Sequence, residues 1–130
     1  SNDCAKVSTD MWVDMEAERT GKTYSEIFND YMPHAIKLMA RHVELAREKD
    51  MDIIWDQTST TVASRQRKFN MLPNYRKIAV VFKTPEPDEL DRRLKSRPGK
   101  EIPANVVEKM IADFDMPSED EGFDEIWYAY

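Results

Sequence analysis

Hydrophobic residues recur along the chain at two spacings, one typical of helices and the other of strands. Over residues 24–50 they recur mostly every three or four positions, which predicts a long helix that Pro33 kinks or divides. Short apolar runs at 51–56 and 77–82 predict buried strands, and 124–128 predicts a final short strand. Further helices are predicted at 10–18, from 62 to about 72, at 87–96 and at 103–114.

Helices alternate with strands in this order, so the sequence predicts an α/β fold with a mainly parallel sheet and helices on both faces. We expect one domain spanning residues 1–130. Ligands of such sheets bind beyond the carboxyl ends of the strands, where the sequence places Asp56, Thr58 and Ser59. Asp56 either caps a helix or turn, or orients Mg²⁺ through water.

Composition narrows the class of protein. The chain has 130 residues, of which 41% are hydrophobic, and this content favours a folded chain. The formal net charge of −6 argues against broad, non-specific coating of nucleic acid, although one nucleic-acid end could still bind a local basic site. The single cysteine, Cys4, excludes an internal disulfide, and no apolar run is long enough to span a membrane. We therefore expect a cytoplasmic protein.

The basic segment, residues 92–100, carries the most unusual charge pattern of the chain. It has no acid and five cations: Arg92, Arg93, Lys95, Arg97 and Lys100. It covers the last turn of one predicted helix and the crossover to the next. The helix dipole alone favours cations there by about 0.3–1 kcal/mol each, which accounts for some of them. The alternative is an anionic ligand, with phosphate the first candidate.

Several short motifs occur in an order that resembles a known family. They are Ser1-Asn2-Asp3, Tyr24-Ser25, Asp56-Gln57-Thr58, Glu89-Leu90, Arg93 with Arg97, and Ile102-Pro103. Their order and spacing resemble the P-loop kinases of the polynucleotide-kinase type, over residues 1–128. The chain also resembles the ATPase-like domain of heterogeneous nuclear ribonucleoprotein U, at Asp56-Gln57-Thr58 and at Phe123-Asp124-Glu125-Ile126.

The resemblance implies transfer of the γ-phosphate of ATP, with Mg²⁺, to the 5′-hydroxyl end of a nucleic acid or to a similar hydroxyl acceptor. Asp3 would be the general base, provided that Ser1 follows directly on a strand. Lys6 would contact the acceptor phosphate, at a position where the family has arginine. Residues 92–102 would form a lid whose Arg97 holds the ATP phosphates during transfer. The nucleotide and phosphate side would comprise Arg93, Arg97, Asp56 and Thr58.

The family's phosphate-binding loop, Gly-x-x-x-x-Gly-Lys-Ser/Thr, has no counterpart in the chain. There are three glycines, and Gly21-Lys22-Thr23 lacks the first glycine of the motif because residue 16 is Glu. In this family the strand before the loop is central, so we expect a gap in the sheet. Three explanations stay open. The chain is a fragment, or it is a relative that has lost the loop, or a second chain fills the gap by homodimerisation or strand exchange.

Three functions are compatible with the sequence. The first is a phosphotransferase of the polynucleotide-kinase type, or part of one. The second is a catalytically inactive kinase-like module that binds a phosphate-bearing ligand or a protein partner. The third is structural, with the cations of the basic segment paired to the acidic run Glu119, Asp120 and Glu121.

Overall fold

The computed structural model describes residues 3–129, so Ser1 and Asn2 of the first motif lie outside the described residues. The chain divides into two compact units. The first consists of residues 1–58 together with 98–100, and the second of residues 59–97 together with 101–130. The assignment of residues 1–130 to a single domain stays a prediction.

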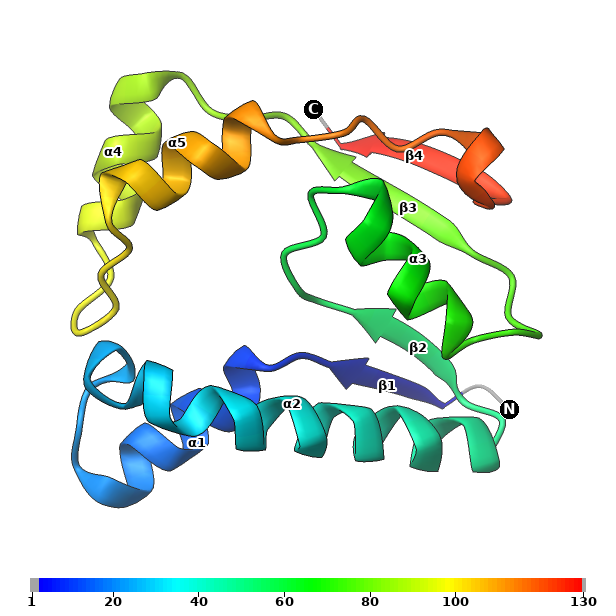
Figure 1. The fold of residues 1–130 in the computed structure, drawn as a ribbon, viewed down its shortest axis with the longest axis horizontal. Coiled ribbons are helices and arrows are strands. Elements are labelled where there is room, and N and C mark those ends of the chain that lie inside the picture. Colours follow the sequence, from blue (N-terminus) through cyan, green and yellow to red (C-terminus); the bar gives the residue numbers. More distant parts are fainter. Residues whose placement is uncertain (1–2, 130) are drawn as a thin grey trace. The chain divides into compact units, whose positions relative to one another are not determined.

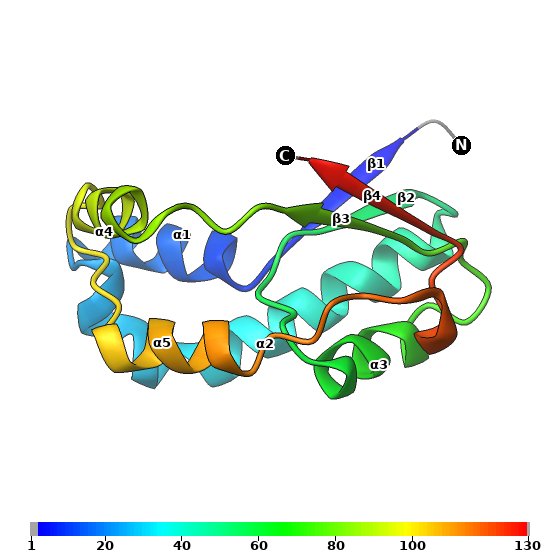
Figure 2. The same ribbon diagram turned by 90° about the horizontal axis from the view of Figure 1, so that it is seen from above.

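The first unit is a parallel strand pair with a long helix along it. Its elements are β1 (Cys4–Val7), α1 (Asp10–Thr20), α2 (Tyr24–Glu48) and β2 (Asp52–Trp55). Cys4 lies opposite Asp52, and Val7 lies opposite Trp55. Figures 1 and 2 show α2 running along one face of this pair, and it contacts both strands. Because the strands run in the same direction, both end at the same edge of the pair.

Small and branched side chains form the core of the first unit. Val13 and Ala17 of α1 pack with Ile27 and Ala35 of α2. The buried residues of α2 lie at helical spacing on one face: Ile27, Ala35, Met39, Val43 and Ala46. Most of this face agrees with the apolar periodicity, but two apolar residues of the periodic pattern, Phe28 and Ile36, are exposed. The start of α2 is fixed by a capping box, in which the Thr23 hydroxyl accepts from the Glu26 amide at 3.2 Å.

Pro33 does not divide the predicted helix, because α2 is continuous from Tyr24 to Glu48. A proline in a helix leaves the carbonyl four residues earlier, here that of Asn29, without its usual donor. Both Pro33 and Asn29 are exposed, so water can satisfy that carbonyl. Buried residues on either side, Ile27 and Ala35, hold the two halves of α2 in one core.

The strand at Cys4–Val7 is not among the strands that the sequence predicts. Asp3 precedes β1 and lies at its amino end, and its role as general base stays a prediction. Ala5 and Val7 are buried while Cys4 and Lys6 are exposed, which is the alternation of a strand with one covered face. Four residues that include a lysine give too weak an apolar pattern to identify as a strand from sequence.

The second unit contains another parallel strand pair. Its elements are α3 (Val62–Asn70), β3 (Ile78–Phe82), α4 (Pro87–Lys95), α5 (Ala104–Ala112), a 3-10 turn η1 (Glu119–Glu121) and β4 (Glu125–Ala129). Ile78 lies opposite Glu125 and Phe82 opposite Ala129, and Figure 2 shows β3 and β4 side by side. The strands described by the structure thus form two separate parallel pairs. Parallel pairing through helical connections confirms the predicted α/β class.

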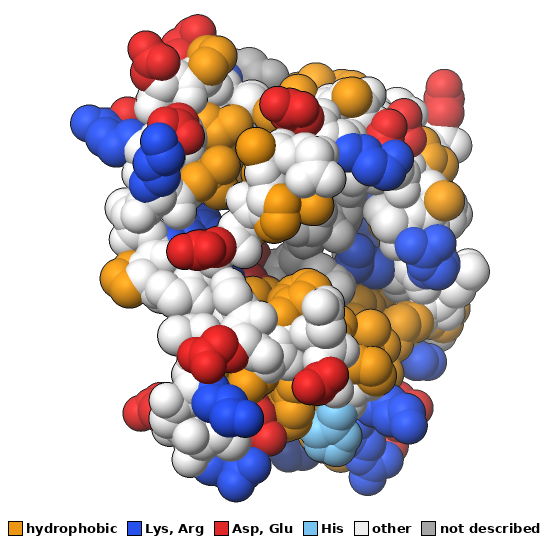
Figure 3. Space-filling view, turned by 60° about the vertical axis from the view of Figure 1, so that its left-hand side comes forward, with side chains coloured by type: hydrophobic (Ala, Val, Ile, Leu, Met, Phe, Trp, Pro, Cys, Tyr) orange, Lys and Arg blue, Asp and Glu red, His pale blue; other side chains and the backbone are white. Residues whose placement is uncertain are grey.

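Apolar side chains are exposed on one face of the β3–β4 pair. Val80 and Phe82 of β3 are 48% and 73% exposed, and Trp127, opposite Val80, is 54% exposed. Residues that lie opposite each other in a parallel pair point to the same face, so these three share it. Figure 3 shows exposed hydrophobic side chains between charged ones on the face that it presents.

None of the described helices combines the length and the apolar character needed to cross a bilayer.

Candidate functional site

Asp56 and Lys6, two of the predicted site residues, meet at the carboxyl end of the first strand pair. Asp56 directly follows β2, and its amide donates to the Val7 carbonyl at 2.9 Å, which extends the strand ladder. The Lys6 ammonium lies 3.5 Å from an Asp56 carboxylate oxygen. Both side chains are about two-thirds exposed. The pair is therefore open to solvent, and a ligand can compete for either member.

The loop after Asp56 is tied to the end of β1. The Trp55 indole donates to the Gln57 side-chain oxygen at 2.9 Å, and the Gln57 amide nitrogen lies 3.5 Å from the Thr9 hydroxyl. Thr9 is itself buried, so Gln57 has a fixed anchor. Thr58 is exposed beside this anchored residue.

A second Ser-x-Asp motif, Ser8-Thr9-Asp10, lies at the carboxyl end of β1. Ser8 and Thr9 are buried, and the Ser8 hydroxyl accepts from the Met11 amide at 3.1 Å at the start of α1. Asp10 is exposed and begins α1. Ligands of parallel sheets bind at this end of the strands, so Asp10 lies where a side chain that acts on a ligand is expected. The sequence contains the signal, since the motif occurs at Ser1, Ser8 and Ser118, but only the position of β1 shows that the copy at Ser8 follows a strand.

Asp10 is held by two partners within the first unit. The Tyr24 hydroxyl donates to one carboxylate oxygen at 2.6 Å, and the Lys100 ammonium lies 3.3 Å from the other. Lys100 also lies over the Tyr24 ring, 4.2 Å from its centroid. A carboxylate with a hydroxyl and an ammonium on it has a defined orientation and a balanced charge.

The second unit contains most of the basic segment, and acids of α4 pair with three of its cations. Arg92 and Arg93 both form ion pairs with Glu89, and the Arg93 guanidinium lies 2.8 Å from a Glu89 carboxylate oxygen. Lys95 lies 2.8 Å from Asp91, and this hydrogen bond raises the pKa of the lysine. The structural hypothesis expected these cations to pair with the acidic run at 119–121, but they do not. Acids one helical turn earlier pair with them instead.

Arg97 differs from the other cations of the basic segment. It is exposed, and no described residue forms a hydrogen bond or ion pair with its side chain. The other four each have a carboxylate partner within the described residues. Arg97 is thus the cation of this segment with the most charge available to an anion.

Arg65 of α3 is a buried cation that the sequence did not single out. It is 4% exposed, and it donates to the two Glu121 carboxylate oxygens at 2.6 and 3.1 Å. It also donates to the carbonyls of Ser59 and Asp115, each at 2.9 Å. Arg65 therefore fixes the segment that directly follows Thr58. Nothing in a run of cations on a predicted helix shows which of them is enclosed.

Lys68 lies on the same helix and contacts the same segment. Its ammonium donates to the Ser59 hydroxyl at 2.5 Å. Burial lowers the pKa of Lys68, and the positive charges of Arg67 and Arg65 lower it further. Ser59 is thus held through its carbonyl by Arg65 and through its hydroxyl by Lys68.

Comparison with known protein families identifies the family of this chain. A family model described as an AAA domain matches residues 1–117. The chain belongs to this AAA domain family. The AAA domain is P-loop NTPase-like, and such domains generally bind nucleotide with Mg²⁺. The incomplete α/β arrangement of the chain fits the predicted fold class. No solved structure matches the chain.

The glycines of this AAA domain do not form a phosphate-binding loop. Gly21 ends α1 with φ of 71°, and the Thr23 hydroxyl that follows is the cap of α2. Gly21-Lys22-Thr23 is therefore a boundary between two helices, as expected for a chance match to the motif. The described residues supply exposed carboxylates and the exposed cation Arg97, but they do not supply the glycine-rich backbone amides that hold the β and γ phosphates in such domains.

Proposed function

We propose that the chain is the acceptor-binding and lid-bearing part of a kinase-like phosphotransferase. The reaction moves the γ-phosphate of ATP to a 5′-hydroxyl end of a nucleic acid or to a similar hydroxyl acceptor. Two carboxylates, Asp10 and Asp56, follow neighbouring parallel strands in an AAA domain, and this observation carries the proposal. Phosphoryl transfer depends mainly on positioning and on charge neutralisation, so side chains placed in this way are what it requires.

Asp10 takes the role of general base in this proposal, in place of Asp3. The acceptor hydroxyl passes its proton to an Asp10 carboxylate oxygen while its own oxygen forms the new bond to the γ-phosphorus. The bond from that phosphorus to the oxygen of ADP breaks. Lys6 contacts the acceptor phosphate, and Asp56 would help to hold Mg²⁺ through water, where the ion would neutralise charge on the phosphates.

Arg97 acts on the phosphates, together with Arg93 four residues earlier in the sequence. The guanidinium of Arg97 has no partner among the described residues, so it can bind the transferred group without first breaking an ion pair. Arg93 must leave Glu89 to do the same. Thr58 contributes a hydroxyl on the nucleotide side.

The first test compares Asp10→Asn with Asp3→Asn in the protein that contains this chain. With γ-labelled ATP and a 5′-hydroxyl oligonucleotide, Asp10→Asn should lower kcat by about 10²- to 10⁴-fold, because the amide cannot accept the proton. Asp3→Asn should leave kcat unchanged, because Asp3 lies at the opposite end of β1. The reverse pattern would restore Asp3 as the base. If the wild-type protein labels no acceptor of any class, the proposed activity itself is rejected.

The second test compares Arg97→Ala with Arg92→Ala. Loss of an arginine that reaches the transferred phosphoryl group lowers kcat by about 10³-fold or more. Arg92 belongs to the same segment but is paired with Glu89, so its removal should change kcat little. Equal losses in the two variants would indicate that the segment acts only through its total charge.

A catalytically inactive binding module is the second candidate, and the absence of a Gly-x-x-x-x-Gly-Lys motif from the sequence favours it. It predicts salt-sensitive binding of a phosphate-bearing ligand by these 130 residues without hydrolysis. Calorimetric titration with a 5′-phosphorylated oligonucleotide at two salt concentrations tests this prediction. Binding that Arg97→Ala abolishes, with no phosphate release from ATP, would support this candidate over the first.

A further inference from the structure

The turn at residues 98–100, which ends the basic segment, is built into the first unit. The Gly99 carbonyl accepts from the Ser25 amide at 3.0 Å, at the start of α2. Gly99 has φ of 70°, and a Cβ placed on it would lie 2.9 Å from the Thr23 side chain. The position therefore requires glycine for its backbone conformation and for its close approach to Thr23.

Lys100 anchors the same turn through its side chain. It is 20% exposed, whereas the paired cations of α4 are between 63% and 77% exposed. It contacts both the Asp10 carboxylate and the Tyr24 ring, and these two groups are joined by their own hydrogen bond. An ion pair that also has an aromatic face and a hydroxyl partner is stronger than an isolated surface pair.

We propose that Asp10, Tyr24 and Lys100 form a latch that reversibly fastens the 98–100 turn to α1 and α2. The contacts are polar and lie near the surface, so the turn can leave without opening the apolar core of Val13, Ala17 and Ile27. Release breaks one ion pair, one cation–π contact and one backbone hydrogen bond together, so the turn engages and disengages as a unit. The latch occupies both oxygens of Asp10 when it is closed. It stands whether or not the chain transfers phosphate.

Limited proteolysis with trypsin measures the latch directly. Trypsin can cleave after Lys100, but Pro98 protects the bond after Arg97. Cleavage of a transiently opened segment follows the population of the open form. Tyr24→Leu removes the ring and the hydroxyl, and should speed cleavage after Lys100 by about fivefold to tenfold. Cleavage after Lys95, within α4, should not change and serves as the internal reference.

Two further variants separate the latch from general loosening. Gly99→Ala should speed the same cleavage, because its Cβ forces the turn away from Thr23. Tyr31→Phe removes a hydroxyl from the same helix outside the latch and should leave cleavage at the wild-type rate. Amide exchange at Ser25 should rise in Tyr24→Leu and Gly99→Ala, while exchange at Val43 in the middle of α2 stays slow. Unchanged cleavage and unchanged Ser25 exchange in both variants would overturn the proposal, as would equal acceleration in Tyr31→Phe.

The latch and the proposed activity fail in different experiments. A protein without phosphotransferase activity can still show faster cleavage in Tyr24→Leu, and then only the function is wrong. Normal activity with unaltered cleavage in the latch variants would reject the latch alone.

Discussion

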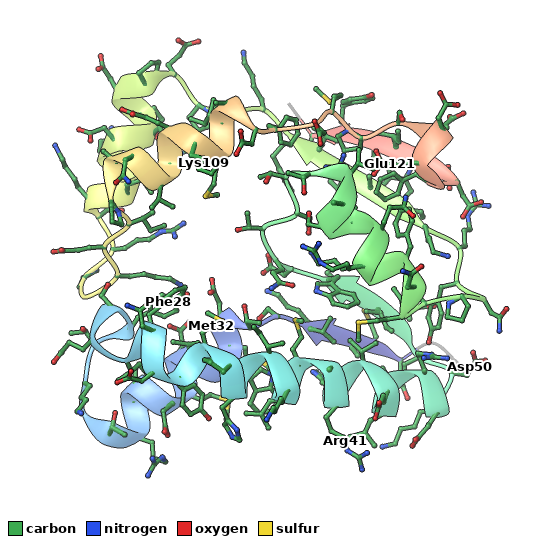
Figure 4. All side chains as sticks on the ribbon, viewed as in Figure 1. Phe28, Met32, Arg41, Asp50, Lys109 and Glu121 are labelled. Atoms are coloured by element: carbon green, nitrogen blue, oxygen red, sulfur yellow. The ribbon has the colours of Figure 1, made fainter. Side chains whose placement is uncertain are left out.

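Burial separates the ion pair of Arg65 and Glu121 from the surface pairs of the molecule. The two side chains are 5% and 4% exposed, and Figure 4 shows Glu121 at the segment that leads into β4. Arg41 and Glu44, in contrast, lie 3.5 Å apart with both side chains more than half exposed, and Arg41 projects away from α2. Removing one member of a buried pair leaves the other charged without compensation, whereas an exposed charge is solvated by water.

Glu121→Gln should therefore destabilise the fold by about 3–5 kcal/mol, because Arg65 stays charged and buried. The matched control, Glu44→Gln, should change the unfolding free energy by less than about 0.5 kcal/mol. Urea denaturation followed by circular dichroism measures both. Similar small losses in the two variants would mean that Arg65 is held mainly by the carbonyls of Ser59 and Asp115.

The Arg65–Glu121 pair makes the stability of the fold depend on pH. Burial alone raises the pKa of Glu121, but the hydrogen bonds from Arg65 and the Ser118 amide outweigh burial and hold the pKa below its ordinary value of 4.5. A lowered folded-state pKa contributes stability above the unfolded-state value, and this contribution is lost as pH falls below 4.5 through the folded-state pKa. The wild type should consequently lose more stability between neutral pH and acid than Glu121→Gln does. Parallel pH profiles of the two proteins would contradict this.

At the scale of elements, α2 contains its own destabilising residue. Pro33 lacks the amide that would bond to the Asn29 carbonyl, yet the helix continues on both sides of it. Its exposed position means that an alanine there would meet no packed neighbour. The cost of the proline is therefore intrinsic to the helix and should be recoverable.

Pro33→Ala should stabilise the chain by about 1–3 kcal/mol, since proline is about 3 kcal/mol worse than alanine inside a helix. The midpoint of thermal unfolding should rise accordingly. Ile36→Ala, at another exposed position of α2, is a control in which no backbone hydrogen bond is restored. A decrease in stability on Pro33→Ala would show that proline fixes a bend on which the core depends.

At the scale of the whole molecule, the two strand pairs leave apolar surface in water. Strands of parallel sheets are usually covered on both faces, and the exposed Val80, Phe82 and Trp127 are an exception. Exposed apolar surface of this kind binds hydrophobic dyes and promotes self-association.

Phe82→Ser should lower the fluorescence of a bound hydrophobic dye with a change in unfolding free energy within about 0.5 kcal/mol. Met15→Ser, which removes an exposed side chain of α1, is the matched control and should leave dye binding unchanged. Equal dye binding by wild type and Phe82→Ser would show that the dye binds elsewhere.

Local patterns in the sequence predict the elements, except β1 and η1, and part of the pairing. The ion pairs of Glu89 and Asp91 lie three or four residues from their partners, a spacing that can be seen in the sequence of α4. The pairs of Asp10 with Lys100 and of Arg65 with Glu121 join residues that are distant in the chain, so no local pattern indicates them. For the same reason the sequence identifies Asp56 at a strand end but assigns the base to the first Ser-x-Asp motif. The choice depends on a strand of only four residues.

The sequence distance between paired residues of the second unit also sets the order in which this unit can form during synthesis. Arg65 is made 56 residues before Glu121, and Ile78 pairs with Glu125. At about 5–20 residues per second, the ribosome needs roughly 3–11 s to cover the first of these intervals. Until then α3 keeps its cation in water, and β3 has no β4 to pair with. The nascent chain therefore exposes an apolar strand for seconds before its partner strand is made.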